Sequence, residues 1–555
     1  MGCPQDRAGL THAGAPRSVP TAVMHVLICD PISPRGIAYF RARPEFRVTV
    51  LSKRLTEAEL LPLVADADAL VVRSETKVSA KVLAAATQLK VVGRAGVGVD
   101  NVDVEAATQR GVVVMNTPAG NTLTTAEMTF FMLGALARKI PAAHASMVAG
   151  KWDRKQFQGT ELFGKVLGIL GAGRIGGEVA KRALAFGMRV VAYDPFLTES
   201  RARQLGVELA TDLDVIYRES DFITVHMPVT PETRGMLNTS AFSKMKPGVR
   251  IINCARGEII AEADLVTALE SGRVAGAALD VFISEPLAAD HRLRSLPNVI
   301  LTPHLGASTE EAQEKCGLEV AEIISGFLLT GEVRNAVNLP GVDAKTYELV
   351  KPYLLLGEKL GSLLRQLAPA HVDRIRITFG GKAQEIPQTD PVTRAILRGY
   401  LSTSSGADIN NVNVRGVASA LGLAIEEKRS DEPVTFHEWL HVQLFHGDIK
   451  VLSAGGTFFG SPNNPRIVRL YSQPVEIPIH GHLLLIRNQD RPGIVGFLGT
   501  VLGRHGVNIA NMSLSRDDAG GEALTVLHLD SVPPTEALAE LQKDPAITSV
   551  KVVSL

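Results

Sequence analysis

The chain of 555 residues carries 58 lysines and arginines against 58 aspartates and glutamates, so its formal net charge is zero. This balance gives no overall attraction to nucleic acid or to an anionic membrane, and no apolar run reaches the roughly 20 residues that span a bilayer. The length predicts several domains, each with its own core. The cysteines, Cys3, Cys29, Cys254 and Cys316, lack metal-ligand spacing, which predicts reduced thiols, a cytoplasmic protein and no metal site.

Residues 1–23 mix Gly, Ala, Pro, Thr and Arg without periodicity, and we expect them to form a disordered extension. Three interpretations stay open: a mis-assigned start with Met24 as the initiator, a plain flexible tail, or an organelle transit peptide. The segment is short and poor in serine, which favours the first two.

From Met24 onward, predicted strands alternate with predicted helices. Short β-branched runs at 25–29, 47–51, 69–72, 89–92 and 112–115 are separated by helical spacers, which predicts a doubly wound parallel sheet. In such sheets, ligands contact the loops at the carboxyl ends of the strands. Those loops contain Arg73-Ser74, Arg94 to Gly98, and Asn116 to Asn121, and two of them begin with an arginine.

The next unit contains the most specific motif of the chain. An apolar run, 166–170, passes into Gly171-Ala172-Gly173-Arg174-Ile175-Gly176 and a helical pattern, and a second strand, 189–193, ends at Asp194. Gly171 permits a tight turn, Gly173 lets a pyrophosphate approach the backbone, and Gly176 lets the helix pack closely. The helix N-terminus offers free N–H groups to the phosphates. Asp194 can bind an adenosine ribose and would repel a 2′-phosphate, which predicts NAD rather than NADP.

Further strands at 222–225, 250–253, 276–279 and 299–302 complete a predicted six-stranded sheet and bring Arg256, Glu285 and His304 to loop positions. This set suits hydride exchange between a 2-hydroxy acid and NAD. Histidine, with an ordinary pKa of about 6.5, suits the base that takes the hydroxyl proton. The glutamate would hold the imidazole ring and stabilise the imidazolium. The arginine would bind the substrate carboxylate and polarise the forming carbonyl.

The order of elements predicts four domains after the N-terminal extension. A long helix with an apolar face (Ala312, Cys316, Val320, Ile323) follows the second sheet and can return the chain to the first lobe. We therefore expect residues 24–120 and 305–338 to form a discontinuous substrate-binding domain, with a cofactor domain, 121–304, inserted into it. Residues 339–478 indicate a separate α+β domain. Residues 481–555 show the β-α-β-β-α-β order of a ferredoxin-like module.

Several stretches resemble the D-isomer-specific 2-hydroxyacid dehydrogenase family. They are Val72-Arg73-Ser74, Val92 to Asn101, Asn116-Thr117-Pro118, Gly120-Asn121, the Gly171 motif, Asn253 to Gly257, Asp280-Val281-Phe282, Glu285-Pro286 and Pro303 to Thr309. The resemblance implies an α/β fold in which a Rossmann cofactor domain is inserted in a flavodoxin-like substrate domain. It extends to the long members of the family, which add an α+β intervening domain and a ferredoxin-like ACT domain.

The resemblance also implies an activity: NAD-dependent oxidation of 3-phospho-D-glycerate to 3-phosphohydroxypyruvate, the first step of L-serine biosynthesis, with L-serine as a feedback inhibitor. It implies that Arg256, Glu285 and His304 are catalytic. The implied substrate-binding residues are Arg73, Ser74, Arg94, Gly96, Val97, Asn121 and Arg256. The implied cofactor-binding residues are Gly171, Gly173, Arg174, Ile175, Gly176, Asp194, His226, Ala255, Asp280, His304 and Gly306.

In the last module, Asp490 and Asn508 match positions that hold the effector in related ACT domains. Three residues depart from the family pattern. Asn488 stands where some relatives carry an aromatic residue, Glu75 follows Arg73-Ser74 where a small residue is common, and Met227 follows His226 where threonine is frequent. Glu75 would place an acid beside the predicted phosphate site.

Three other interpretations remain. The first is a glyoxylate or hydroxypyruvate reductase of the same family, which the two loop arginines and the added C-terminal half disfavour. The second is an NAD-sensing transcriptional corepressor, a class that carries disordered tails where this chain has a folded pattern. The third treats the intervening and ACT domains as purely structural oligomerisation units. ACT modules commonly pair edge to edge, so we expect a homodimer or homotetramer in either case.

Overall fold

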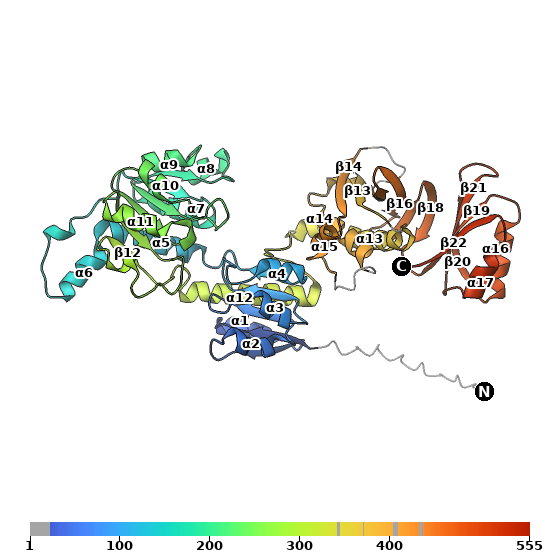
Figure 1. The fold of residues 1–555 in the computed structure, drawn as a ribbon, viewed down its shortest axis with the longest axis horizontal. Coiled ribbons are helices and arrows are strands. Elements are labelled where there is room, and N and C mark those ends of the chain that lie inside the picture. The colour runs from blue at the N-terminus through green and yellow to red at the C-terminus, as the bar shows by residue number, and fades with distance from the viewer. Residues whose placement is uncertain (1–22, 341–343, 370, 403–408, 432–435, 437) are drawn as a thin grey trace, which may run out of the picture.

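The computed structural model describes residues 23–340, 344–369, 371–402, 409–431, 436 and 438–555. All but the last residue of the predicted disordered extension therefore lies outside the described residues. Figure 1 shows an elongated arrangement of two lobes followed by two smaller units, with the ACT-like unit at the far end.

The first lobe is built on a five-stranded sheet of order β2-β1-β3-β4-β5 in which all pairs are parallel. The strands are β1 (Met24–Ile28), β2 (Phe46–Val50), β3 (Ala69–Val72), β4 (Val91–Arg94) and β5 (Val113–Asn116). The helices between them are α1 (Pro34–Arg41), α2 (Glu57–Val64), α3 (Ala80–Ala85) and α4 (Val104–Gln109). The order is that of flavodoxin-like sheets, so the predicted doubly wound architecture is confirmed.

Helix α12 (Glu310–Thr330) brings the chain back to this lobe. Its apolar face, including Val320 and Ile324, is buried in one core cluster with Val26 and Ile28 of β1. Helices α1 and α12 cross closely at Gly36, where an added Cβ would lie 2.2 Å from the carbonyl oxygen of Gly317. The one-sided apolar pattern of the helix thus correctly indicates its return.

The second lobe has a seven-stranded parallel sheet of order β12-β11-β10-β9-β6-β7-β8. Its strands are β6 (Val166–Leu170), β7 (Arg189–Tyr193), β8 (Glu208–Leu209), β9 (Phe222–Val225), β10 (Val249–Asn253), β11 (Val274–Leu279) and β12 (Val299–Leu301). The helices are α5 (Thr122–Arg138), α6 (Ile140–Val148), α7 (Arg174–Ala185), α8 (Glu199–Leu205), α9 (Leu213–Glu219), α10 (Thr239–Lys244) and α11 (Glu262–Glu270). The sequence predicts six of the strands. The edge strand β8 has two residues, too few for a periodic signal.

Strand order in the second lobe reverses between β6 and β9, because the chain first builds outward to β8 and then returns to the other side of β6. Ligands of open parallel sheets bind in the crevice at such a reversal, outside the carboxyl ends of the strands. The glycine motif lies at this point, directly after β6.

The third unit is a six-stranded sheet of order β14-β13-β15-β16-β17-β18, packed on α13 (Ala344–Leu367), α14 (Asp390–Leu401) and α15 (Val414–Ala420). The strands are β13 (Arg374–Gly381), β14 (Ala424–Ser430), β15 (Glu438–His446), β16 (Ile449–Phe458), β17 (Pro465–Leu470) and β18 (Gln473–Pro478). The alternating run 374–379 and the apolar stretches near 436–445 and 467–470 predict β13, β15 and β17, but the other three strands are missed. The edge strand β14 is mostly polar, and the paired glycines 455 and 456 weaken the strand pattern of β16.

The fourth unit has the predicted β-α-β-β-α-β order, with a sheet of order β20-β21-β19-β22. Its elements are β19 (His482–Gln489), α16 (Ile494–Arg504), β20 (Ile509–Arg516), β21 (Glu522–Leu529), α17 (Thr535–Leu541) and β22 (Ile547–Ser554). One sheet face is covered by α16 and α17. The other face contributes Leu483, Leu485, Leu524 and Val526 to the core of the third unit, so these two units share a hydrophobic core.

A short loop of the third unit, residues 410–412, inserts into the first lobe; we call it the docking loop. The side-chain amide of Asn410 donates a hydrogen bond of 2.8 Å to the carbonyl of Gly111, which lies between α4 and β5. Val412 is 5% exposed and belongs to the hydrophobic core of the first lobe. The docking loop thus fixes the third unit beside β5.

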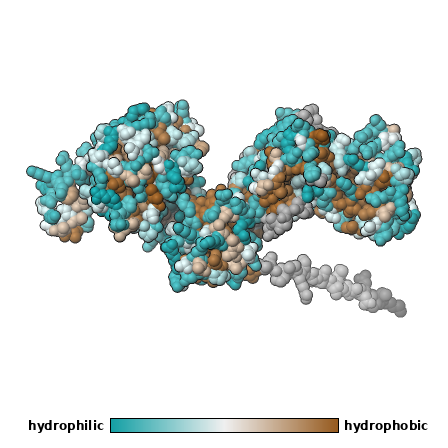
Figure 2. Space-filling model, viewed as in Figure 1, coloured by the Kyte–Doolittle hydropathy of each residue, from teal (hydrophilic) through white to brown (hydrophobic). Residues whose placement is uncertain are grey.

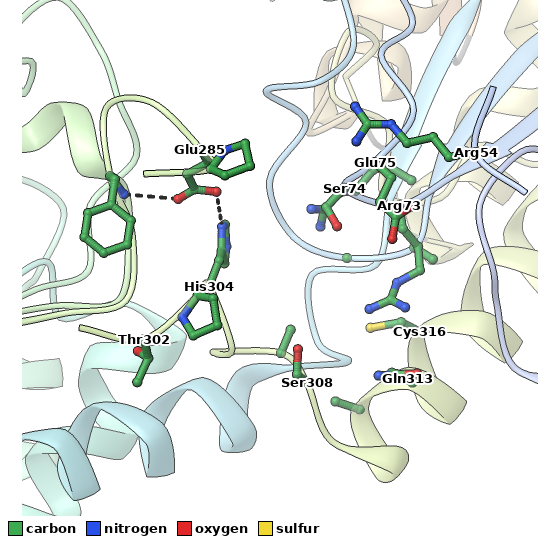
Figure 3. Close-up of a pocket in the computed structure, with 18 of the residues that line it drawn as sticks. Arg54, Arg73, Ser74, Glu75, Glu285, Thr302, His304, Ser308, Gln313 and Cys316 are labelled. Carbon is green, nitrogen blue, oxygen red and sulfur yellow. Dashed lines mark hydrogen bonds and ion pairs between the residues drawn. The ribbon is translucent and has the colours of Figure 1, made fainter. Parts of the chain in front are cut away.

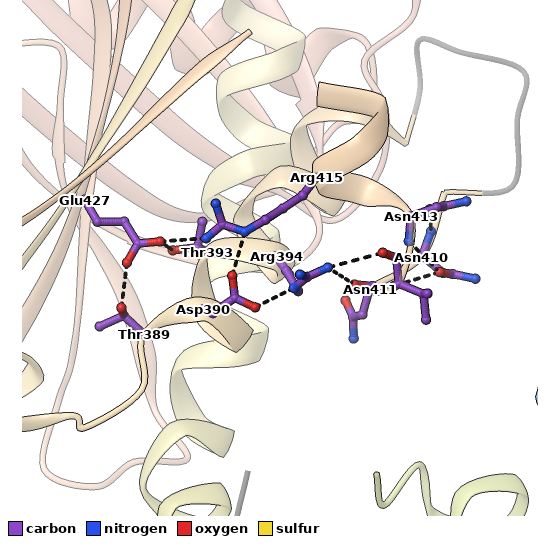
Figure 4. Close-up of polar contacts among 10 residues, drawn as sticks. Thr389, Asp390, Thr393, Arg394, Asn410, Asn411, Asn413, Arg415 and Glu427 are labelled. Carbon is purple, nitrogen blue, oxygen red and sulfur yellow. Dashed lines mark hydrogen bonds and ion pairs between the residues drawn. The ribbon is translucent and has the colours of Figure 1, made fainter. Parts of the chain in front are cut away.

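A polar network within the third unit supports the docking loop (Figure 4). Arg394 donates hydrogen bonds to the carbonyl of Asn411 at 2.7 Å and to that of Val412 at 3.2 Å. Asp390 joins Arg394, at 2.5 Å, to Arg415, at 2.6 Å. Arg415 also pairs with Glu427 at 2.8 Å on β14. The loop is therefore held by helix α14 and, through Arg415, by the edge of the sheet.

Candidate active site

The glycine motif forms a tight turn between β6 and α7. Gly171 has φ +94°, and an added Cβ would lie 2.6 Å from the carbonyl oxygen of His226. At Gly176 an added Cβ would lie 2.0 Å from the carbonyl oxygen of Gly171. Gly173 faces open space and caps α7 without a side-chain hydrogen bond, so the first N–H groups of the helix are free to bind a phosphate. The motif fits a dinucleotide pyrophosphate.

Asp194 lies beside this turn, at the end of β7. Its carboxylate accepts hydrogen bonds from the backbone N–H of Ala172 at 3.0 Å and of Phe196 at 2.8 Å. A hollow here is lined by Gly173, Arg174, Asp194 and neighbouring residues. The backbone thus fixes the carboxylate at the place where an adenosine ribose would follow the pyrophosphate.

His226 is a further predicted cofactor residue, and its ring has one nitrogen without a hydrogen-bond partner. His226 has a hydrogen bond of 3.1 Å between Nε2 and the hydroxyl of Thr224, while its Nδ1 is buried without a partner. Burial lowers the pKa of His226 to about 3, so the ring is neutral at physiological pH. The unpaired nitrogen is a polar group that a bound ligand could satisfy.

Asp280 is fully buried and organises the loop that carries His304. Its carboxylate accepts hydrogen bonds from the hydroxyl of Thr302 at 2.6 Å and from the backbone N–H groups of Leu305 and Gly306, both at 2.8 Å. The resemblance implies that Asp280 binds the cofactor, and in the structure both of its carboxylate oxygens accept hydrogen bonds from this loop. Among the other predicted cofactor residues, Ile175 packs partly buried on α7 against the second-lobe core, and the carbonyl of Ala255 accepts a hydrogen bond of 2.6 Å from Arg256.

His304 and Glu285 form a hydrogen-bonded pair, with 2.7 Å between Nδ1 and Oε2. His304 has φ +55°, a left-handed conformation that is uncommon outside glycine. Partial burial would raise the pKa of Glu285, but the hydrogen bond and charge of His304 outweigh it, so the pKa of this carboxyl lies below its ordinary value. The pair fixes the ring so that Nε2 is left for a substrate, as a general base requires.

Arg256 points to the first lobe. Its Nε lies 2.7 Å from a carboxylate oxygen of Asp100, in the loop that follows β4. An added Cβ at Gly98 would lie 1.6 Å from the Arg256 guanidinium, so the two lobes touch at this point. Arg256 belongs to the same lobe as His304 and Glu285, but in this structure its guanidinium contacts the other lobe.

A cavity of about 640 Å³ separates His304 and Glu285 from a strongly cationic wall on the first lobe. Figure 3 shows the His304–Glu285 pair on one side and Arg54 and Arg73 on the other. The cations of this wall are Arg54, Arg73, Lys77 and Arg94. None of them pairs with a carboxylate within the described residues, although the exposed Glu75 also lines the cavity.

Arg94 shows how strongly this wall favours an anion. Burial and then the charge of Arg256 lower the pKa of Arg94 to about 10, and its Nε is buried without a hydrogen-bond partner. A buried cation without a counter-ion is costly. At Gly96, φ +153°, an added Cβ would lie 1.7 Å from the Arg94 guanidinium, so glycine here leaves room for the arginine.

The structure brings together most of the predicted substrate and catalytic residues. Arg73, Ser74, Arg94, Gly96, Glu285 and His304 line the one cavity. Val97, Asn121 and Arg256 are not among its lining residues; the Asn121 side-chain oxygen is buried without a partner at the start of α5. The cavity also contains Arg54, Lys77, Arg294 and Gln313, which sequence analysis missed. Arg54 closely follows β2, so the same strand-end rule could have found it.

The two predicted effector residues lie far apart within one chain. Strands β19 and β20 both run antiparallel to β21, so Asp490, after β19, lies at one end of the sheet and Asn508, before β20, at the other. Asp490 pairs with Arg516 at 2.6 Å, and Asn508 donates a hydrogen bond of 2.7 Å to Asp530. One copy of the chain does not bring the two groups together.

Neither a membrane span nor a metal centre appears in the described part of the chain. No helix there is long and apolar enough to cross a bilayer. No group of three or more histidine, cysteine or acidic side chains gathers there as metal ligands. Cys29, Cys254 and Cys316 are buried free thiols.

Three family models match the chain. Residues 130–306 match the NAD binding domain of D-isomer specific 2-hydroxyacid dehydrogenases. Residues 349–471 match the D-3-phosphoglycerate dehydrogenase intervening domain, and residues 482–546 match the ACT domain. Fold and site together thus define an NAD-dependent 2-hydroxyacid dehydrogenase whose C-terminal half contains an intervening domain and an ACT domain.

Curated relatives match nearly the whole chain. The D-3-phosphoglycerate dehydrogenase of Synechocystis is 43% identical, covering 96% of this chain and 94% of the relative. That of Archaeoglobus fulgidus is 42% identical over 96% and 100%, and that of Bacillus subtilis is likewise 42% identical over 96% and 100%. The chain belongs to the D-3-phosphoglycerate dehydrogenase family.

Solved structures match the first two lobes. A Thermus thermophilus protein is 37% identical with a TM-score of 0.53, covering 57% of this chain and 100% of that chain. A glyoxylate reductase from Paecilomyes thermophila is 30% identical with a TM-score of 0.53 over 57% and 99%. An NAD-dependent formate dehydrogenase from Staphylococcus aureus, solved with NAD, is 28% identical with a TM-score of 0.52 over 57% and 100%.

Proposed function

We propose that the chain catalyses the reversible, NAD-dependent oxidation of 3-phospho-D-glycerate to 3-phosphohydroxypyruvate, the entry step of L-serine biosynthesis. One observation carries the proposal: four cations that have no carboxylate partner in the described part of the chain face the His304–Glu285 pair across a single cavity. A hydroxy acid with a phosphate at its far end would place opposite charge on that wall and its reacting hydroxyl at the histidine. The shared name of the relatives supports the same substrate.

In the proposed reaction, Arg73 and Arg54 bind the phosphate through charge-assisted hydrogen bonds. His304 takes the hydroxyl proton on Nε2 while Glu285 accepts a hydrogen bond from Nδ1–H and stabilises the imidazolium. NAD, held by the glycine motif and Asp194, would supply the hydride acceptor for the same carbon. Arg256 binds the substrate carboxylate after exchanging its partner Asp100 for it, and its charge polarises the carbonyl that forms.

The test compares NADH-dependent reduction of 3-phosphohydroxypyruvate and hydroxypyruvate by the purified chain. A strong preference for the phosphorylated acid supports the proposal. Equal rates, or a preference for hydroxypyruvate, would favour a glyoxylate or hydroxypyruvate reductase. A solved glyoxylate reductase is among the structures similar to this chain. NAD binding without turnover of either acid would favour a corepressor.

We further propose that the chain forms a homodimer or homotetramer through α6. Figure 2 shows hydrophobic surface on the arm that contains this helix. No residue of α6 is buried, and Ile140, Met147 and Val148 are 55%, 52% and 75% exposed. Phe131 and Trp152 beside them are 69% and 76% exposed. A second copy would cover this apolar surface. Val148→Asp should lower the mass measured by light scattering, and an unchanged mass would contradict this interface.

L-serine is the proposed effector of the ACT domain. Because Asp490 and Asn508 lie at opposite ends of the sheet, an effector that uses both needs a second copy. The edge strand β20 carries the exposed Met512 and Leu514 and can pair antiparallel with its counterpart. Such pairing sets Asp490 near Asn508 of the partner subunit. L-serine should then inhibit the wild type but not Asn508→Ala; equal sensitivity would contradict this site.

Domain boundaries and location complete the proposal. We assign residues 24–120 and 305–338 to the substrate domain, 121–304 to the cofactor domain, 339–478 to the intervening domain and 481–555 to the ACT domain. The cytoplasmic location predicted from the cysteines stays a prediction.

A further inference from the structure

We propose that Asp30 and Asn101 are positioning residues for the phosphate end of the substrate. Their side chains form hydrogen bonds to the backbone of the turn Arg73–Thr76 from two sides. These bonds position the Arg73 guanidinium toward the cavity. The inference rests on the proposed function and names residues that act through Arg73 rather than by touching the substrate.

Asp30 closes β1 and lies under the turn that follows the neighbouring strand, β3. It is 2% exposed. Its Oδ2 accepts hydrogen bonds from the backbone N–H of Arg73 at 2.6 Å and of Thr76 at 3.1 Å. Its Oδ1 accepts one of 2.5 Å from the hydroxyl of Thr76. The whole carboxylate is therefore engaged with the first and last residues of the turn.

Asn101 grips the same two residues through their carbonyl groups. Its side-chain amide donates hydrogen bonds to the carbonyl of Arg73 at 2.8 Å and to that of Thr76 at 2.7 Å. Both backbone polar groups of Arg73 and of Thr76 are thus bound by two side chains from different loops. Ser74 and Glu75 between them are exposed.

Burying the Asp30 carboxylate costs free energy, and its hydrogen bonds to the turn compensate for that cost. A buried carboxylate is unfavourable without compensation, and Asp30 has no ion-pair partner in the described part of the chain; its hydrogen bonds all go to the turn. The guanidinium of Arg73 likewise has no partner among the described residues, so its own contacts do not hold it. A fixed backbone limits where this long side chain can reach, which is how a binding group is preorganised.

Asparagine at position 30 gives a sharp control. Its side-chain oxygen can accept from the two N–H groups while its amide donates to the Thr76 hydroxyl, which can turn to accept. Asp30→Asn therefore keeps the grip and removes the charge, whereas Asp30→Ala removes both. Asn101→Ala releases the turn from the other side without altering any charge.

The experiment measures KM and kcat of the full chain for 3-phosphohydroxypyruvate and hydroxypyruvate. Asp30→Ala and Asn101→Ala should each raise KM for the phosphorylated acid about tenfold, with kcat and KM for hydroxypyruvate within about twofold. Asp30→Asn should stay near the wild type. In an Arg73→Ala background, Asp30→Ala and Asn101→Ala should add nothing further, because they act through that arginine.

An equal rise of KM for both acids, or full additivity with Arg73→Ala, would overturn the inference and leave Asp30 and Asn101 as ordinary structural residues. An unchanged KM in Asn101→Ala would also overturn it, and this variant decides alone if Asp30→Ala does not fold. A wild type that does not distinguish the two acids would refute the proposed function itself, and the inference with it, before any variant is made.

Discussion

The ion pair between Arg256 and Asp100 makes the role of the arginine measurable. If Arg256 binds the substrate carboxylate, the substrate must displace Asp100, whose carboxylate lies 2.7 Å from the guanidinium. The pair therefore competes with binding. Asp100→Asn removes that competition while preserving the size of the side chain, so we expect a lower KM and an unchanged kcat.

The magnitude follows from the exposure of the pair. The side chain of Asp100 is 63% exposed and that of Arg256 is 26% exposed, so the pair belongs with surface ion pairs, worth about 0.2–1 kcal/mol. At about 1.4 kcal/mol per factor of ten, its loss should lower KM by a factor of roughly 1.4 to 5. Salt screens exposed charges, so the effect should shrink as ionic strength rises.

The assay is initial-rate reduction of 3-phosphohydroxypyruvate at low and high salt. Glu105→Gln is the matched control, because it removes one negative charge from an exposed position of the same lobe without contacting Arg256. A raised KM in Asp100→Asn would show that Asp100 holds Arg256 in its working position, which would refute the exchange of partners. A fall of the same size in Glu105→Gln would attribute the effect to net charge alone.

Four further outcomes are expected. His304→Ala should lower kcat by about 10²- to 10⁴-fold, the usual contribution of a general base, while NAD affinity from fluorescence titration stays constant; near-normal turnover would remove His304 from the mechanism. Arg73→Ala should raise KM for 3-phosphohydroxypyruvate much more than for hydroxypyruvate, and parallel changes would contradict a phosphate contact. Val412→Ala should lower the unfolding free energy by about 2 kcal/mol because two buried methyl groups are lost. The denaturant midpoint measures this loss, and an unchanged midpoint would show that the docking loop is exposed in solution. Because the pKa of Glu285 lies below its ordinary value, its ionised form stabilises the fold above the unfolded pKa of about 4.3. That stability is lost as pH falls through the folded pKa. The difference in unfolding free energy between the wild type and Glu285→Gln should therefore shrink as the pH is lowered.

The strand-end rule accounts for what sequence analysis found at the site. Arg73 and His304 each follow a parallel strand and Arg94 ends one, and all three line the same cavity. The rule does not say which atoms meet. The Arg256–Asp100 pair and the gap between Asp490 and Asn508 depend on side-chain direction and on the antiparallel register of β19 to β21, neither of which periodicity encodes.

Missed elements share a physical cause. Strand β8 has two residues, and the edge strand β14 is mostly polar, so neither carries an alternation signal. Gln313 reaches the cavity from the first turn of helix α12, nine residues after His304. No strand ends at Gln313, so the strand-end rule does not single it out.

The docking loop has a practical consequence for dissecting this chain. Val412 fills part of the first-lobe core from a position more than 70 residues beyond the end of α12. A fragment that stops after α12 would keep both lobes of the active site and would uncover the apolar surface that this valine seals. Such a fragment should be prone to self-association. A change in its activity could then come from lost solubility as well as from lost regulation, so the uncovered apolar patch should first be made polar.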